Sequence, residues 1–75
     1  MKSVQVSLKA IEDVKDFVNI VNRYPFDVDL SSGRYVVDGK SIMGIFSLDL
    51  SKPIKVDVHS DDCREFLEEI KDFIV

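Results

Sequence analysis

Cysteine and histidine are nearly absent from this chain, which contains one of each, Cys63 and His59, and no tryptophan. A single cysteine cannot form an internal disulfide, and with a single histidine it cannot complete a zinc site. Cys63 falls at an apolar position of a predicted helix, so we expect a buried, inert thiol. This cysteine usage favours the cytoplasm.

Long hydrophobic runs and basic clusters are also missing. No apolar run approaches the roughly 20 residues that span a bilayer, and Met1-Lys2-Ser3-Val4 is not typical of a signal peptide, so we expect no membrane association. The ten basic residues are scattered, and the formal net charge is −4. Binding to a phosphate backbone requires clustered basic residues, so this pattern argues against nucleic acid.

The sequence lacks every short motif that would indicate catalysis. It has no glycine-rich phosphate loop, CxxC, HExxH or GxSxG. Its 14 acidic residues fall on predicted solvated helix faces and strand edges, with no second catalytic group at a suitable spacing. We therefore predict a protein that is not an enzyme and has neither a cofactor nor a metal site.

The length of 75 residues predicts one domain, residues 1–75, with a thin core. A chain of about 60 residues buries only roughly 60 % of the surface that it exposes when unfolded. A deep enclosed active site is therefore not expected, and function should lie on the surface.

The hydrophobic periodicity predicts four strands and three helices. Apolar residues alternate with polar ones in the strands and recur at three- and four-residue spacing in the two long helices, with Ile11 on the apolar side of the first. The predicted elements are, in order, a strand over 4–8, a helix over 11–24, strands over 26–31 and 35–37, a short helix over 41–48, a strand over 54–59 and a helix over 61–73.

Local signals set the predicted boundaries. Pro25 ends the first long helix, because proline cannot continue a helical hydrogen-bond pattern. Ser60 followed by two aspartates predicts the N-cap of the last helix, and Asp62 with Glu65 has the spacing of a capping box. Phe66 and Leu67 lie within the apolar stripe of this helix and are predicted to be buried.

The order β-α-β-β-α-β-α predicts an α+β fold. Two long helices and four strands, each apolar on one side, suit two layers in which helices cover one face of an antiparallel sheet. The other sheet face would be open to water.

The stretch KSIMGIFSL, Lys40 to Leu48, carries a resemblance to a known family. It is similar to the second helix and regulatory serine of HPr, the histidine-containing phosphocarrier of the bacterial sugar phosphotransferase system. The resemblance continues through the fourth strand and last helix and implies the HPr-like open-faced two-layer sandwich. It also implies that Ser41 corresponds to the serine that an ATP-dependent HPr kinase phosphorylates.

The family's second motif is missing. HPr proteins carry Gly-x-His-x-Arg-Pro between the first strand and first helix, where the histidine accepts a phosphoryl group from enzyme I. The segment Ser7 to Asp13 contains no histidine, arginine or proline, and Glu12 and Asp13 would repel a phosphate at the start of the helix. In an antiparallel sheet, His59 falls at the opposite pole, so phosphocarrier activity at histidine is predicted to be absent.

The stretch itself leaves two interpretations open. Ser41 is either a plain N-cap or a regulatory phosphorylation site, as in the catabolite-repression HPr homologues of Gram-positive bacteria, which lack the histidine. Ile42, Met43 and Phe46 either pack more deeply into the core or form an exposed docking patch, because Ile45 and Leu48 also compete for the core.

Two functions follow from these alternatives. One is a monomeric, cytoplasmic regulatory module that binds protein partners, such as an HPr kinase, another phosphotransferase-system protein or a transcriptional regulator. The other is a degenerate or altered phosphocarrier component of the same system.

Overall fold

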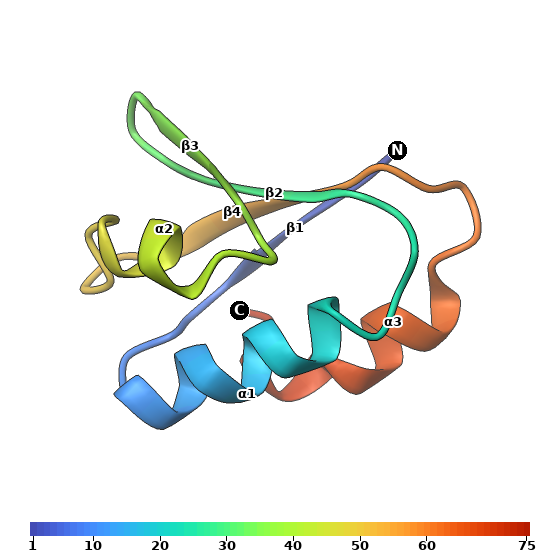
Figure 1. Cartoon of the computed structure of the whole chain (residues 1–75), viewed down its shortest axis with the longest axis horizontal. Coiled ribbons are helices and arrows are strands. Elements are labelled where there is room, and N and C mark those ends of the chain that lie inside the picture. Colours follow the sequence, from blue (N-terminus) through green and yellow to red (C-terminus); the bar gives the residue numbers. More distant parts are fainter.

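The structure, a computed structural model that describes residues 1–75, has two layers (Figure 1). Helices cover one face of a four-stranded antiparallel sheet, so the predicted α+β class and element order are confirmed. The elements are β1 (Lys2–Val6), α1 (Ile11–Val21), β2 (Val28–Ser32), β3 (Tyr35–Asp38), α2 (Ile42–Phe46), β4 (Ile54–Val58), α3 (Arg64–Glu69) and the 3₁₀ turn η1 (Lys71–Phe73).

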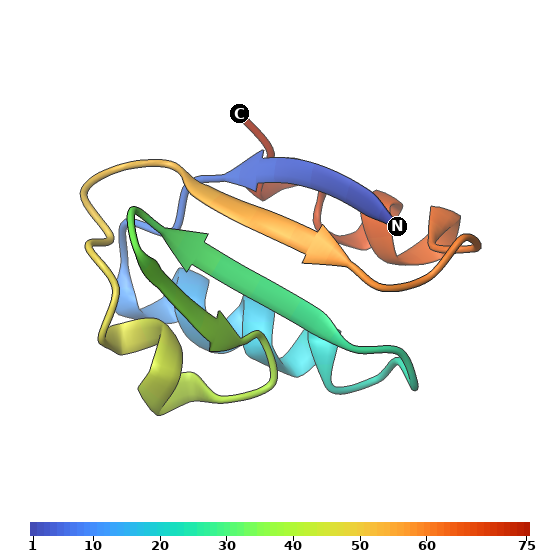
Figure 2. The ribbon, with the colours of Figure 1, turned by 90° about the horizontal axis from the view of Figure 1, so that it is seen from above.

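The sheet has the strand order β1-β4-β2-β3, which makes β1 and β3 its edges (Figure 2). The central strand β4 pairs with β1, placing Val56 opposite Val4, and with β2, placing Val56 opposite Leu30. The outer edge of β1 is partly covered by the C-terminal residues. The Ser7 N–H donates to the Phe73 carbonyl at 2.8 Å, and the Val75 N–H donates to the Gln5 carbonyl at 3.0 Å.

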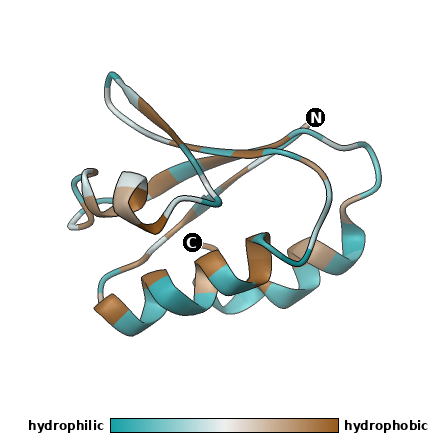
Figure 3. Cartoon of the chain, in the orientation of Figure 1, coloured by the Kyte–Doolittle hydropathy of each residue, from teal (hydrophilic) through white to brown (hydrophobic).

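The core lies between the sheet and the helices. The inner-face residues of the central strand β4, such as Val56, are fully buried, whereas the adjacent Lys55 faces water, because successive strand residues point to opposite faces. Colouring by hydropathy shows apolar and polar positions interspersed along α1, whose buried residues recur at three- and four-residue spacing (Figure 3). No helix here has the length and apolar composition that a bilayer crossing demands.

The first helix ends earlier than its periodicity predicts. Its α-helical part stops at Val21. The Arg23 N–H then donates to the Ile20 carbonyl and the Tyr24 N–H to the Val21 carbonyl, a three-residue spacing typical of a 3₁₀ turn, and Pro25 follows. At its start, Ile11 is 64 % exposed, so its assignment to the apolar face was wrong. Ile11 is the first helical residue and lies beyond the rim of the core.

The last helix begins at Arg64, and the capping prediction for it was wrong. Its N-cap is Cys63, which provides no side-chain hydrogen bond. The Ser60 hydroxyl instead accepts from the Asp62 N–H and donates to the Asp62 carbonyl, which holds residues 60–62 in a local turn. The helix is therefore shorter than 61–73, and η1 completes it. Cys63 is buried, as predicted.

An aromatic cluster joins the two long helical segments. Phe66 in α3 meets the rings of Phe17, Tyr24 and Phe26 edge-on, with centroid separations of 6.5, 5.3 and 5.6 Å. Phe26 was predicted to begin a strand, but β2 starts at Val28, and the loop before it turns Phe26 into this cluster. The cluster therefore uses residues from α1, α3 and the α1–β2 loop.

Polar contacts at the surface reinforce this junction. The Tyr24 hydroxyl donates to the Glu69 carboxylate, and the Arg23 guanidinium lies 2.8 Å from the same carboxylate. The hydrogen bond to Glu69 raises the pKa of Tyr24 to about 12, because it stabilises the protonated phenol, and partial burial and the nearby negative charge act in the same direction. Both contacts tie the end of α1 to the end of α3.

Truncation of Phe66 should reveal how much the fold depends on this cluster. Phe66 is fully buried, whereas Leu67 is half-buried, contrary to the prediction that both would be buried. We expect Phe66→Ala to lower the free energy of unfolding by about 3–5 kcal/mol, and Leu67→Ala by clearly less. Urea unfolding of both variants tests this, and equal losses would contradict the assigned role of Phe66.

Candidate functional site

The turn before α2 fixes the position of Ser41. The Gly39 N–H donates to the Val28 carbonyl at 2.7 Å, and the Ser41 N–H donates to the Asp38 carbonyl at 3.0 Å. A Cβ atom at Gly39 would lie only 2.9 Å from Leu30 Cδ1 and from the Val28 oxygen. The close approach of β2 therefore requires glycine immediately before Lys40 and Ser41.

Ser41 is the N-cap of α2. Its backbone is extended, and its Oγ accepts a hydrogen bond from the Gly44 N–H at 3.2 Å. The residue is exposed, so its hydroxyl is on the surface as well as at the helix start. The helix spans Ile42–Phe46, shorter than the predicted 41–48, and a turn bonded from the Leu48 N–H to the Ile45 carbonyl follows it.

The side chains of α2 divide between core and surface. Ile45 is fully buried and Leu48 is 6 % exposed, so these two residues occupy the core. Met43 is 75 % exposed and Phe46 is 37 % exposed, whereas Ile42 is half-buried and packs against the core cluster. The structure therefore places Met43 and Phe46 on the surface and Ile42 at the boundary.

Helical geometry makes these three side chains neighbours. At 100° per residue, Ile42, Phe46 and Met43 lie within one arc of about 100° around the axis of α2. Gly44 lies on another side, where an added Cβ would be 3.2 Å from Val37 Cβ in β3. We call the surface formed by Ile42, Met43 and Phe46 the α2 patch. It begins directly after Ser41.

The start of α1 contains no histidine. Ala10 is the N-cap and has no side chain that could accept a hydrogen bond. The Asp13 carboxylate instead accepts from the Ala10 N–H at 3.3 Å, and Glu12 adds a second acid to the first turn. These carboxylates compensate the positive end of the helix, so the place is already supplied with negative charge.

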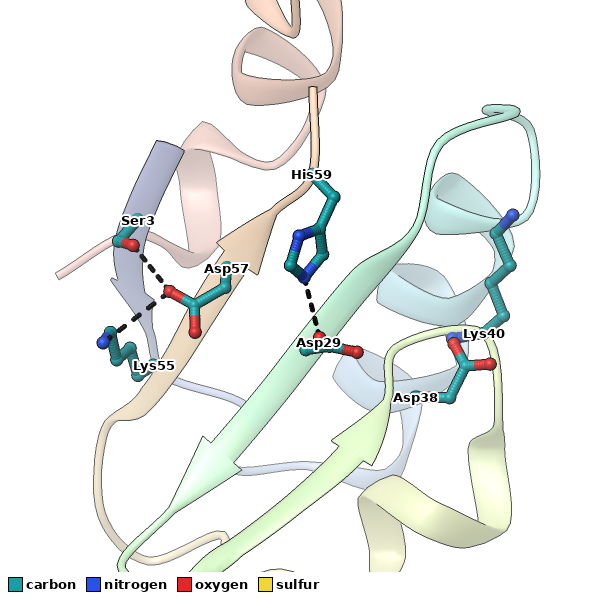
Figure 4. Close-up of polar contacts among 7 residues, drawn as sticks. All are labelled: Ser3, Asp29, Asp38, Lys40, Lys55, Asp57 and His59. Atoms are coloured by element: carbon teal, nitrogen blue, oxygen red, sulfur yellow. Dashed lines mark hydrogen bonds and ion pairs between the residues drawn. The ribbon is translucent and has the colours of Figure 1, made fainter. Parts of the chain in front are cut away.

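The single histidine lies elsewhere. His59 follows Val58, which pairs with Lys2 at the beginning of β1, whereas α1 starts after the end of β1. Its Nε2 lies 2.7 Å from Asp29 Oδ2, on the sheet face opposite the helices (Figure 4). The structure thus separates His59 from the start of α1.

The strand register produces a row of acids that sequence reasoning missed. Asp29 is opposite Asp57 on one side and Asp38 on the other, so three aspartates cross three adjacent strands. Their partners limit the repulsion: Asp57 accepts from the Ser3 hydroxyl at 2.5 Å, Asp38 accepts from the Lys40 N–H at 2.9 Å, and Asp29 meets His59 (Figure 4). No group of three or more His, Cys, Asp or Glu side chains could hold a metal ion.

The sequence of the chain matches a known protein family. The sequence model of a family described as "PTS HPr component phosphorylation site" matches residues 13–75. The chain belongs to the HPr family. The match starts at Asp13, after the segment in which the family histidine would stand.

Solved structures of HPr proteins are similar to this chain over almost its whole length. The phosphocarrier protein HPr from Bacillus anthracis is 32% identical, with a TM-score of 0.73, and the match covers 99% of this chain and 94% of that protein. HPr from Thermoanaerobacter tengcongensis is 26% identical, with a TM-score of 0.80 and coverage of 96% and 89%. A comparison with curated proteins finds no match.

A structure of Crh from Bacillus subtilis is also similar. Crh, described as a catabolite repression containing protein, is 26% identical, with a TM-score of 0.66 and coverage of 96% and 88%. HPr-family proteins interact with other proteins of the phosphotransferase system, and they are phosphocarriers rather than enzymes.

The N-cap bond of Ser41 can be tested by substitution. Ser41→Ala removes the acceptor for the Gly44 N–H and should lower the free energy of unfolding by about 1 kcal/mol. Ser41→Asp should retain most of the stability, since aspartate is also a favoured N-cap. Thermal unfolding of the two variants measures the difference, and a loss larger for Ser41→Asp than for Ser41→Ala would contradict the capping role.

Proposed function

We propose that this HPr-family protein is a regulatory, protein-binding module of the phosphoenolpyruvate-dependent sugar phosphotransferase system, without histidine phosphocarrier activity. The observation that carries the proposal is the start of α1. The place of the family histidine is occupied by a segment without histidine, and Asp13 accepts from the Ala10 N–H there. An incoming phosphoryl group would find no histidine and would meet two carboxylates.

The remaining family site is Ser41, which we propose is phosphorylated by an HPr kinase. The hydroxyl is exposed, and its own capping bond shows that the Gly44 N–H points toward it. A phosphate would add about −1.5 to −2 charge at this helix start, a favourable placement. The modification should therefore leave the fold intact and act on binding.

The α2 patch is the proposed contact surface for a protein partner. Met43 and Phe46 are exposed without being needed in the core, which Ile45 and Leu48 fill. Methionine adapts to different partner surfaces and phenylalanine provides a large contact area. A phosphate on Ser41 would stand beside these side chains and change how a partner approaches them.

The proposed partners are an HPr kinase, another phosphotransferase-system protein or a transcriptional regulator, in the cytoplasm. We propose that the protein itself is a monomer, since β1 is held between β4 on one side and residues 73–75 on the other. Light scattering should then give 8.6 kDa. The Crh structure is described as an intertwined dimer with a swapped domain. The measured mass therefore distinguishes a monomer from a dimer of the kind described for Crh.

A degenerate or altered phosphocarrier is the second candidate, and family membership is the observation that favours it. The two candidates differ in one respect: an altered phosphocarrier must still receive a phosphoryl group from enzyme I.

Intact mass after phosphorylation distinguishes the candidates. Enzyme I with phosphoenolpyruvate should leave the mass unchanged, and HPr kinase with ATP should add one phosphate. Ser41→Ala is the control for the second reaction, and a histidine-containing HPr is the positive control for the first. Acid-labile phosphate on His59 would refute the proposal, and a kinase reaction that adds no phosphate would remove the switch from it.

Truncation of the α2 patch tests docking separately from folding. Because Phe46 is only partly buried, Phe46→Ala should weaken binding to the HPr kinase by about tenfold with little loss of stability. Titration calorimetry and urea unfolding provide the two measurements, and Ile45→Ala is the control for a core position. If Phe46→Ala lost several kcal/mol of stability and no affinity, the stretch would be an N-capped core helix.

A further inference from the structure

The two edge strands of the sheet, β1 and β3, differ in their backbone hydrogen bonds. The outer edge of β1 receives backbone bonds from Phe73 and Val75, whereas β3 pairs with β2 alone. An uncovered edge strand offers backbone groups to another extended chain. The outer edge of β3 is therefore a second candidate contact surface, separate from the α2 patch.

The hydrogen-bond register identifies which groups of β3 are free. The Gly39 N–H bonds to the Val28 carbonyl, and antiparallel bonds recur at every second residue, so Tyr35 and Val37 direct their backbone groups to β2. Val36 and Asp38 direct theirs outward. The Asp38 carbonyl accepts from the Ser41 N–H, which leaves the Val36 N–H, the Val36 carbonyl and the Asp38 N–H.

Apolar side chains flank these free groups on both faces of the sheet. Val36 is 66 % exposed on the open face, and Tyr35 is 71 % exposed on the side of the helices. An added strand would cover both, because its own side chains alternate between the two faces. Burial of this apolar surface would add to the binding free energy that the backbone hydrogen bonds provide.

The charges next to Tyr35 indicate what such a strand would carry. A cleft between the β2–β3 turn and the α2–β4 loop is lined by Tyr35, Arg34 and Lys52, together with Asp49. Neither Arg34 nor Lys52 forms an ion pair within 4 Å, whereas hydrogen bonds from Ser51 hold Asp49 and lower the pKa of its carboxyl group. The charge of Lys52 also lowers the pKa of Asp49, whereas Arg34 has no such partner, and neither cation is held in a close ion pair. The cleft thus offers two cations that a carboxylate segment could approach.

We propose that β3 is a strand-addition site for an extended protein segment in which carboxylate residues alternate with apolar residues. The carboxylates face Arg34 and Lys52, the apolar side chains cover Val36, and the backbone bonds to Val36 and Asp38. The site uses neither the Ser41 hydroxyl nor the side chains of the α2 patch, although α2 lies next to β3. Peptide binding at β3 can therefore fail or hold apart from the proposed function.

The probe is a synthetic peptide, acetyl-Glu-Val-Glu-Val-Glu-amide, with a peptide of the same length that has lysine in place of glutamate as control. On titration, amide resonances of residues 34–38 and Lys52 should shift with the glutamate peptide, and amide exchange of Val36 and Asp38 should slow. The lysine peptide should bind at least about tenfold more weakly. Equal binding of both peptides, or shifts confined to Asp29, Asp57 and His59, would overturn the proposal.

Proline substitution tests the backbone bonds. Val36→Pro removes an N–H that points away from β2, so the sheet should keep its ladder while the peptide loses a bond and most of its affinity. If this variant does not fold, Arg34→Glu with Lys52→Glu retains the backbone and should weaken glutamate-peptide binding about tenfold. Undiminished binding in either folded variant would refute the site.

Discussion

Burial of Phe66 between two helical segments and a loop is the constraint on which the helical layer depends. Its ring meets Phe17 and Tyr24 from α1 and Phe26 from the loop before β2, all edge-on. A 75-residue chain has few such contacts to lose, because its buried core is small. The cluster fixes α1 against α3, and the Tyr24–Glu69 bond closes the same junction at the surface.

Membership of the family and the absence of a histidine before α1 are compatible in physical terms. The HPr fold depends on apolar residues that bury one sheet face, and the chain retains these. Phosphoryl transfer depends on a nucleophile and an anion-binding helix start, and here Ala10, Glu12 and Asp13 stand at that start. Fold and chemistry lie on different residues, so one can be retained without the other. The α2 stretch retains both the fold contacts of Ile45 and the exposed Ser41.

Local pattern predicted the helices well in type and less well at their ends. Periodicity gave the position of α1 and α3, but competing local bonds moved their boundaries. Ser60 closes a turn onto Asp62 where a helix cap was predicted, and Pro25 follows a 3₁₀-like turn at Tyr24. Caps are decided by single hydrogen bonds with close alternatives, whereas an apolar stripe is decided by many contacts at once. Leu67 shows a similar limit of local pattern: the apolar stripe predicted a buried side chain, and the side chain is half-buried.

The sequence by itself determined the order of elements, the face that each one buries, the Ser41 cap and the absence of a histidine before α1. These properties depend on residue type and spacing along the chain. Only the tertiary structure decided the register that aligns Asp29, Asp38 and Asp57, the exposure of Met43 and Phe46, and the cleft between Arg34 and Lys52. These depend on which strands become neighbours, and residues far apart in sequence carry no local signal of that pairing.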